Sequence, residues 1–355
     1  MPPISAGFLR LKHAVNLAGR SHGDQMARLV AAFASSHSLM LAATTQDWVD
    51  GFRQTDRRMP LFDKDGTPRD YDELLAAAPP HAESLVTPEK MREAYERTFK
   101  AVAELKRHID GCALDALIIV GDDQHELFQD SMMPALGIYY GKTIRNAAQE
   151  KTPEGNWYKH AMMQRLEPQR DVHYPVHAGL ALHLIIELTK CEFDLCALRE
   201  IAPHQYEGHA YSYIHRTYLQ ERNLPVVPIM MNTYYAPNPP TPKRCVQLGL
   251  KLKEVIQSYP AEMRVGILAS GGLSHFVVDE ELDLGVIQAL REKDLDYLAH
   301  LDPKRLQAGS SEIRSWIVIA ASAAAADLKL DWVDYIAAYR TPALTGAGLG
   351  FARWS

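Results

Sequence analysis

Apolar runs alternate with amphipathic stretches along most of this chain. Runs of this kind predict buried strands, because a central parallel strand is covered on both faces. The predicted strands are Leu29–Ser35, Ala116–Val120, Phe193–Leu198, Pro225–Met231 and Arg264–Ala269. Helices are predicted over Thr87–Ile109, which has charges on one face, and over Leu180–Thr189, which is apolar almost throughout. The alternation predicts an α/β fold with a mainly parallel or mixed central sheet flanked by helices.

Residues Thr44–Pro80 follow a different pattern. They are rich in charge, proline and glycine, and they have little periodicity. A loop of this length inside a compact protein is usually functional or disordered. The sequence leaves two interpretations open, a lid over a binding site and a solvated excursion.

Composition narrows the class of protein. The 355 residues are 47% hydrophobic and 23% charged, as in a globular protein with a sizeable core. The formal net charge is -6 and no basic block occurs, which argues against nucleic acid or an anionic membrane as the main partner. The four cysteines form no CxxC pair, and neither a signal-peptide core nor an apolar span of membrane length occurs. We expect a cytoplasmic protein with reduced thiols.

Histidines follow three of the predicted strands. They are His37 in "SSHSLML", His125 in "GDDQHELF" and His275 in "SGGLSHF". The carboxyl ends of parallel strands meet in the crevice where open α/β sheets bind ligands. Each histidine alone is explained by an ordinary structural role, but three at equivalent positions predict one shared pocket.

A carboxylate that would complete a metal site occurs in "AGSSEIRSW". Ser310 or Ser311 is a suitable N-cap, which places Glu312 in the first turn of a helix. The helix dipole favours an anion there, so a purely structural explanation stays open. Two histidines and one carboxylate form the facial triad of non-haem Fe(II) oxygenases.

Two more segments hold candidate site residues. In "YPVHAGLALHLIIEL", His183 lies in an apolar helical run and is expected to be structural, whereas His177 begins that helix and can project into a crevice. In "GHAYSYIH", the alternation of His209, Tyr211 and Tyr213 suits a strand with one face on a pocket. Aromatic packing in the core explains that alternation equally well.

Taken together, the motifs resemble those of the class III extradiol ring-cleavage dioxygenases. The segments that carry the resemblance are "SSHSLML", "GDDQHELF", "YPVHAGLALHLI", "VVPIMMNTYYAPNPPTPKRC", "ASGGLSHF" and "AGSSEIRSW". They look most like the catalytic subunit of protocatechuate 4,5-dioxygenase and the gallate and 3-O-methylgallate enzymes. The resemblance runs from about Phe33 to the carboxyl terminus. It implies a single catalytic domain over residues 1–355, with a lid-like excursion at about 44–80 and the active site at the carboxyl ends of the strands.

The resemblance also implies roles for individual residues. His37, His125 and Glu312 would be the Fe(II) ligands, and His275 would be the acid/base residue. His177 would contact the substrate oxygens and share in catalysis. The implied reaction is extradiol, or meta, cleavage of a catecholic ring with insertion of both atoms of dioxygen.

Two positions depart from the family pattern. Leu39 replaces a proline after the first motif, and Gln124 separates the second aspartate from the histidine that usually follows it directly. The related enzymes accept carboxylated catechols or gallates, which implies a partner for a carboxylate. Arg340 and Tyr213 are the candidate substrate-binding residues. Small aromatic substrate and dioxygen would be the partners, and a homo-oligomer, a dimer, is expected.

Two other functions are compatible with these residues. A metal-dependent hydrolase could hold Zn²⁺ on the same histidines, with a bound water as nucleophile. A binding protein without activity could keep the same fold. The match to "GGLSHF" and "EIRSW" favours the oxygenase, and the presence of all five candidate site residues argues against loss of catalysis.

Overall fold

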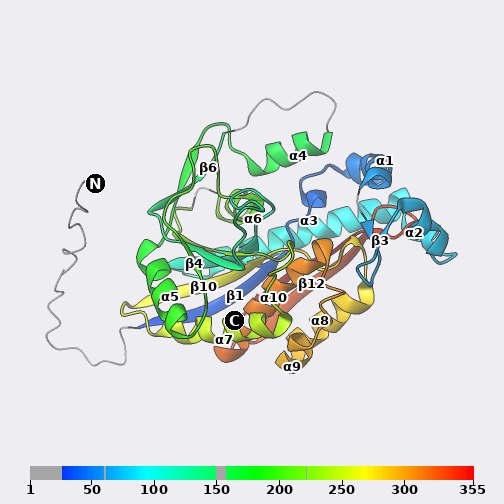
Figure 1. Cartoon of the computed structure of the whole chain (residues 1–355). Coiled ribbons are helices and arrows are strands. Elements are labelled where there is room, and N and C mark those ends of the chain that lie inside the picture. Colours follow the sequence, from blue (N-terminus) through cyan, green and yellow to red (C-terminus); the bar gives the residue numbers. More distant parts are fainter. Residues whose placement is uncertain (1–25, 60, 149–156, 221) are drawn as a thin grey trace, which may run out of the picture.

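A mixed sheet forms the centre of the molecule. The computed structural model describes residues 26–59, 61–148, 157–220 and 222–355, and within them the main sheet has nine strands in the order β11-β13-β1-β10-β4-β9-β5-β8, with β12 beside β13 (Figure 1). The strands are β1 Ala27–Ser35, β4 Ala116–Asp122, β5 Leu136–Tyr139, β8 Cys196–Leu198, β9 Val226–Met231, β10 Met263–Ser270, β11 His275–Val277, β12 Leu330–Tyr339 and β13 Thr345–Trp354.

The middle of this sheet is parallel and its sides are antiparallel. Strands β1, β10, β4 and β9 run parallel, whereas β5 opposes β9 and β13 opposes β1, β11 and β12. The predicted α/β class with a mainly parallel or mixed sheet is confirmed, and each of the predicted strands overlaps an observed one. The long hairpin of β12 and β13 was not predicted.

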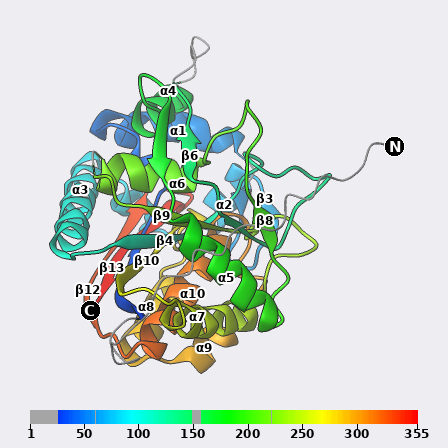
Figure 2. The same ribbon diagram turned by 90° about the vertical axis from the view of Figure 1, so that its left-hand side faces the viewer.

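Helices cover both faces of the sheet. One face is covered by α5 Ala178–Lys190, α7 Pro242–Gln257, α8 Glu280–Glu292, α9 Leu295–Ala299 and α10 Ile313–Ala325. The opposite face is covered by α3 Pro88–Gly111, α6 His209–Ile214 and the continuing turn η5 His215–Leu219. Figure 2 shows α5 and α7 on one side of the strands and α3 and α6 on the other.

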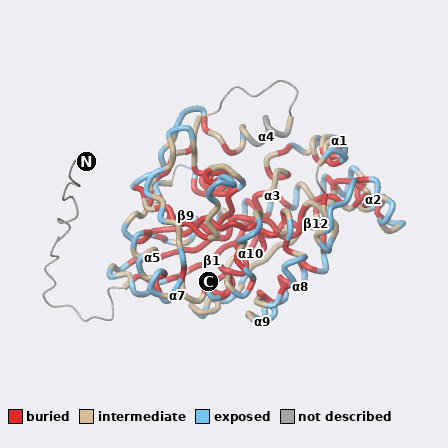
Figure 3. The backbone as a smooth tube through the Cα atoms, viewed as in Figure 1, coloured by how far each residue is buried: buried red, intermediate tan, exposed pale blue. Residues whose placement is uncertain are grey.

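The apolar strands separate two cores. In β4, Ala116, Ile118 and Val120 pack into the core on the α7 side. Leu117 and Ile119 pack into the core on the α3 side. Side chains alternate across a strand, so a run that is buried on both faces must be apolar throughout. Figure 3 shows these central strands as the most buried part of the chain.

The segment between β1 and α3 folds into short elements. They are η1 Leu39–Leu41, η2 Asp47–Gly51, α1 Phe52–Thr55, η3 Asp56–Arg58, β2 Leu61–Phe62, β3 Pro68–Arg69, α2 Tyr71–Ala77 and η4 Ala82–Leu85. The indole N–H of Trp48 donates to the Met40 carbonyl at 2.8 Å, and Trp48 is fully buried. The described part of Thr44–Pro80 is therefore packed onto the domain.

The remaining elements lie around the two ends of the central strands. They are the hairpin of β6 Thr143–Asn146 and β7 Val172–Pro175, the helix α4 Trp157–Leu166, and the turn η6 Ala308–Glu312. Helix α4 lies over α6 in both ribbon views. "GHAYSYIH" forms helix α6, so its interpretation as a strand was wrong. In the described part of the chain, no helix is long and apolar enough to cross a membrane.

Candidate metal centre

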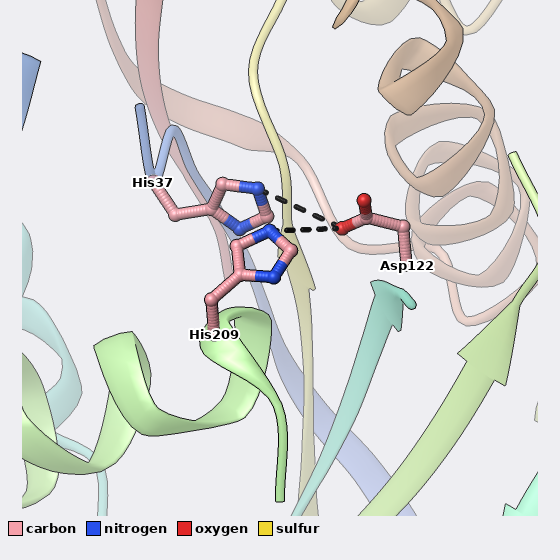
Figure 4. A group of neighbouring side chains, drawn as sticks. All are labelled: His37, Asp122 and His209. Atoms are coloured by element: carbon pink, nitrogen blue, oxygen red, sulfur yellow. Dashed lines mark ion pairs between the residues drawn. The ribbon is translucent and has the colours of Figure 1, made fainter. Parts of the chain in front are cut away.

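Polar side chains from three segments meet at the carboxyl end of the sheet. His37 follows β1, Asp122 ends β4, and His209 begins α6 (Figure 4). Strands β1 and β4 flank β10, so their ends are close in space. One ligand atom from each of the three side chains lies within 4.8 Å of the others. The arrangement is that of a candidate metal site.

Two buried atoms that face each other in the cluster have no hydrogen-bond partner among the described residues. His37 Nε2 lies 3.6 Å from Asp122 Oδ1 and 3.2 Å from Glu312 Oε2. In the described structure His37 Nε2 and Asp122 Oδ1 are buried and form no hydrogen bond. Buried polar atoms without partners are costly, so they are rare unless a ligand or ion satisfies them. A bound cation would satisfy both.

Hydrogen bonds fix the orientation of the His37 ring. Its Nδ1 lies 3.0 Å from Ser270 Oγ, and that hydroxyl donates to the Ala210 carbonyl at 2.7 Å. A hydroxyl has one proton, so Ser270 accepts from His37 Nδ1–H. The unprotonated Nε2 then points at the carboxylates, which is the tautomer that a metal ligand needs.

His209 is held in the same manner by a carboxylate. Glu126 accepts from both the backbone N–H and the Nδ1 of His209, at 2.7 and 2.8 Å. The Nε2 lies 3.7 Å from Asp122 Oδ1. Burial alone would lower the pKa of His209, but Glu126 and Asp122 together raise it to about 10. A carboxylate behind a histidine is the usual second partner of a metal-binding imidazole.

The loop after β4 orients Asp122. Gln124 donates its side-chain amide to Asp122 Oδ2 at 3.0 Å, which leaves Oδ1 towards the histidines. Asp123 accepts the backbone N–H groups of Leu127 and Phe128 and so holds the loop. Burial, followed by the charge of Glu312, raises the pKa of Asp122. A cation beside Asp122 would offset that cost.

Glu312 and His275 form the other half of the cluster. Glu312 lies between η6 and α10 and accepts the backbone N–H of Gly272 at 2.6 Å. His275 Nε2 lies 3.3 Å from Glu312 Oε1, and its Nδ1 donates to the Leu273 carbonyl at 2.8 Å. Burial would raise the pKa of Glu312, but His37 and His275 lower it well below its ordinary value. Burial lowers the pKa of His275, and Glu312 reverses this and raises it.

Two glycines leave room for the His275 ring. A Cβ on Gly309 would lie 2.0 Å from His275 Cδ2, and a Cβ on Gly272 would lie 2.7 Å from its Cε1. The ring is therefore enclosed between "GGLSH" and "AGSSE". Glycine is needed at these two positions because a larger side chain would clash with the ring, and not because the backbone conformation is unusual.

The structure brings three predicted residues together and leaves one nearby. His37, Glu312 and His275 lie in the cluster. His125 lies on the same loop as Asp122, but its Nε2 is 3.0 Å from Asp130 Oδ1 and its ring stacks on Tyr235 at 3.9 Å. The His125 backbone has φ 64°, and its side chain is 32% exposed. Asp122 and His209 occupy the place that the sequence interpretation gave to His125.

His177 lies at the opposite end of the sheet. Its backbone N–H donates to the carbonyl of Val226, the first residue of β9. Its ring caps α5 by accepting the Leu180 N–H at 3.0 Å. The expected helix start is confirmed, but the structure does not bring His177 to the cluster. His183 lies within hydrogen-bond distance of the Val255 carbonyl and Ser258 Oγ, consistent with a structural role.

The two candidate substrate residues have different surroundings. The Tyr213 ring is buried and lies edge-on to His37, with ring centroids 6.5 Å apart. Arg340 is also buried, and its Nε lies 3.0 Å from Asp56 Oδ2. The Nε of Arg340 is thus already paired within the fold, whereas its Nη2 is buried without a hydrogen bond in the described structure.

Two cavities flank the cluster. One of about 250 Å³ is lined by Gln124, Glu126, Leu166, Glu167, Tyr206 and His209. A smaller one of about 20 Å³ is lined on one side by His275 and Ser310 and on the other by Phe62, Asp63, Lys64 and Gly66 of the β2–β3 region. The described part of the Thr44–Pro80 excursion therefore faces His275.

A match to a family model identifies the protein family of this chain. The model described as the catalytic LigB subunit of aromatic ring-opening dioxygenase matches residues 75–350. The chain belongs to this LigB family. The match confirms the resemblance to class III extradiol dioxygenases seen in the sequence. Dioxygenases of this family are metal-dependent, in agreement with the cluster of His37, Asp122 and His209.

A curated relative supports the same class of enzyme. Gallate dioxygenase from Pseudomonas putida is 32% identical over 134 residues. The match covers 37% of this chain and 37% of that protein. The relative therefore supports the LigB assignment over part of the chain.

Proposed function

We propose that this LigB-family chain is a non-haem Fe(II) extradiol dioxygenase that opens the ring of a catecholic aromatic. The observation that carries the proposal is the pair of buried, unpartnered atoms His37 Nε2 and Asp122 Oδ1, which face each other at 3.6 Å. A cation between them removes the cost of both. Imidazole and carboxylate ligands suit Fe(II), and two histidines with a carboxylate leave positions open.

The proposed ligands are His37, His209 and Asp122, and the carboxylate of Glu312 lies beside them. Glu312 Oε2 is 3.2 Å from His37 Nε2, and His209 Nε2 is 3.7 Å from Asp122 Oδ1. His125 is left out because its imidazole already pairs with Asp130. When bound, Fe(II) supplies adjacent positions for the two oxygens of a catechol and for dioxygen.

His275 is the proposed acid and base. Its Nδ1 is held by the Leu273 carbonyl, so only Nε2 can exchange a proton with the site. A phenolic proton must leave when the substrate binds, and a proton must return during ring opening. One histidine can do both near neutral pH. Glu312, 3.3 Å from that nitrogen, stabilises the protonated ring between the two events.

The proposed substrate carries a carboxylate, and Arg165 rather than Arg340 is its proposed anchor. Arg340 is paired with Asp56. Arg165 lies in α4, over the site, and its Nε is buried without a hydrogen bond to the described residues. Its charge acts on Tyr213, where it opposes the rise in pKa caused by burial. The Tyr213 hydroxyl is likewise buried and unpartnered in the described structure.

Oxygen uptake tests the reaction. The protein would be loaded anaerobically with Fe(II) and mixed with protocatechuate, gallate, 3-O-methylgallate or catechol in an oxygen electrode. We expect one dioxygen consumed per ring opened, with a carboxylated substrate preferred over catechol. No uptake with any of the four, together with Zn²⁺-dependent hydrolysis, would overturn the proposal.

Iron content of two variants tests the ligand set. We expect His209→Ala to lose iron affinity by about 10- to 100-fold or more, the range seen when groups around a metal are removed. His125→Ala is the matched control, because His125 lies on the same loop as Asp122, and it should bind iron normally. If His125→Ala loses iron and His209→Ala keeps it, the ligand assignment made from the sequence is the correct one.

A further inference from the structure

A third cavity, of about 1000 Å³, lies at the other end of the sheet. It is lined by Lys106, Asp110, Arg170, Val172, His173, Tyr174, Pro175, His215, Arg216, Leu219, Gln220, Arg222 and Asn223. Asp110 lies at the end of α3, before β4 begins at Ala116, and Asn223 precedes β9, which begins at Val226. The cavity is therefore at the amino ends of the strands whose carboxyl ends carry the metal cluster. The seven residues of β4 span about 20 Å from one end of the sheet to the other.

The described lining is cationic in a chain whose formal net charge is -6. Four of these side chains are lysine or arginine and one, Asp110, is a carboxylate. Lys106 and Arg222 share that carboxylate, each at 2.8 Å. Arg170 and Arg216 form no ion pair with the described residues, so the lining holds an excess of positive charge. Such a cavity concentrates anions.

Buried nitrogen atoms in the wall are also unsatisfied. His215 is 1% exposed, its Nδ1 donates to Glu207 Oε2 at 2.6 Å, and its ring stacks on Tyr174 at 3.8 Å. The other ring nitrogen, Nε2, is buried and has no hydrogen bond in the described structure. The same holds for Arg216 Nε, one residue further along. Buried groups of this kind are normally satisfied by a ligand, an ion or water.

We propose that this cavity binds a small organic anion that carries at least two carboxylate or phosphate groups. Guanidinium groups bind both oxyanions through paired N–H donors. Two unpaired arginines call for more than one anionic group, and a cavity of about 1000 Å³ exceeds the size of a single inorganic ion. The inference does not depend on the proposed ring-opening activity.

Calorimetry on the full-length protein tests the proposal. Citrate and pyrophosphate are the probes at low ionic strength, and erythritol is the uncharged control. We expect one molecule of citrate or pyrophosphate to bind per chain and the affinity to fall as NaCl screens the arginines. Preference for citrate identifies a polycarboxylate ligand, and preference for pyrophosphate identifies a phosphorylated one. Absence of binding by both probes would overturn the proposal.

Variants locate the binding. The double substitution Arg170→Gln and Arg216→Gln should weaken binding by at least about tenfold, because two bidentate contacts are lost. Arg291→Gln, an exposed position at the end of α8, is the matched control and should bind like the parent chain. Arg170 is itself exposed, so Arg170→Gln alone serves if the double variant does not fold. Equal affinity in the parent, the Arg170→Gln chain and the control would contradict the assignment.

Discussion

The segment formed by α6 and η5 carries two histidine–glutamate pairs, one at the start of each element. At the start of α6, beside the candidate metal site, His209 Nδ1 lies 2.8 Å from Glu126, and at the start of η5 His215 Nδ1 lies 2.6 Å from Glu207. The two pairs are alike in chemistry, but their surroundings differ. His209 Nε2 faces the carboxylate of Asp122, whereas His215 stacks on Tyr174 in a wall that contains arginines.

The comparison indicates that the charged groups on the far side of each imidazole ring determine whether its surroundings favour a cation or an anion. Carboxylates opposite His209 favour a positive charge at this position. Arginines beside His215 need an anion. A histidine–glutamate pair in a sequence therefore does not identify a metal site by itself, because the second set of charges comes from segments that are distant in the chain.

The largest expected effect is on iron affinity and oxygen uptake, and it should follow substitution at only one end of the sheet. His37→Ala should lower iron affinity by more than about 100-fold and abolish oxygen uptake, because the substitution removes a proposed ligand. His177→Ala, at the amino end, should retain both. Metal analysis and an oxygen electrode measure the two properties. If the His177→Ala protein is inactive but has its full iron content, the result would support the substrate contact that the sequence predicted for His177.

A smaller effect is expected from a single methyl group near the metal end. In Gly309→Ala the new Cβ would overlap the His275 ring at 2.0 Å, so the ring must move. Misplacement of an acid/base group costs about 10²-fold, and we expect kcat to fall by that order with iron retained. Gly111→Ala is the control, because its Cβ meets no atom within 4 Å. Equal kcat in the two variants would show that the His275 position does not limit turnover.

The third effect is on stability rather than activity, and it concerns a buried carboxylate behind His275. Asp283 accepts the Ser274 N–H and hydroxyl at 2.8 and 2.7 Å, and so supports the residue before His275. Burial raises its pKa from 3.8 to about 6, against the hydrogen bonds of Ser274. Between these pH values the native state keeps a proton that the unfolded state has lost. The free energy of unfolding should therefore fall as pH rises through this window, by up to about 3 kcal/mol.

Denaturant titrations from pH 4 to 7 would measure this slope. Asp283→Asn removes the titrating group, so its slope should be less negative than that of the parent chain. Asp327→Asn changes an exposed carboxylate paired with Lys293 and serves as the control. Parallel slopes in the parent and the Asp283→Asn chain would contradict a raised pKa.

Local sequence patterns were sufficient for the parallel strands and for part of the cluster. Apolar runs identified β1, β4, β9 and β10, because strands covered on both faces contain few polar residues. His37 and His275 were found because they follow such strands, and Glu312 because serines mark a helix start. These signals depend on residues within a few positions of each other.

The other features depend on contacts between distant segments. His209 reaches the cluster because α6 crosses the end of β4, and nothing near "GHAYSYIH" indicates that crossing. His125 is turned to Asp130 by the local backbone, a direction that the motif does not encode. The hairpin of β12 and β13 lies at the side of the sheet and has no uniform apolar run. The lid and the dimer stay predictions.

The buried pair of Arg340 and Asp56 limits how far the turn η3 can move. It joins the turn η3, within the Thr44–Pro80 excursion, to the end of the β12–β13 hairpin, and both side chains are almost completely buried. Outward movement of η3 would take Asp56 away and leave Arg340 as a buried charge without a partner, which is costly. The pair therefore fastens η3 to the turn between β12 and β13, like a bolt between two segments that are far apart in the chain.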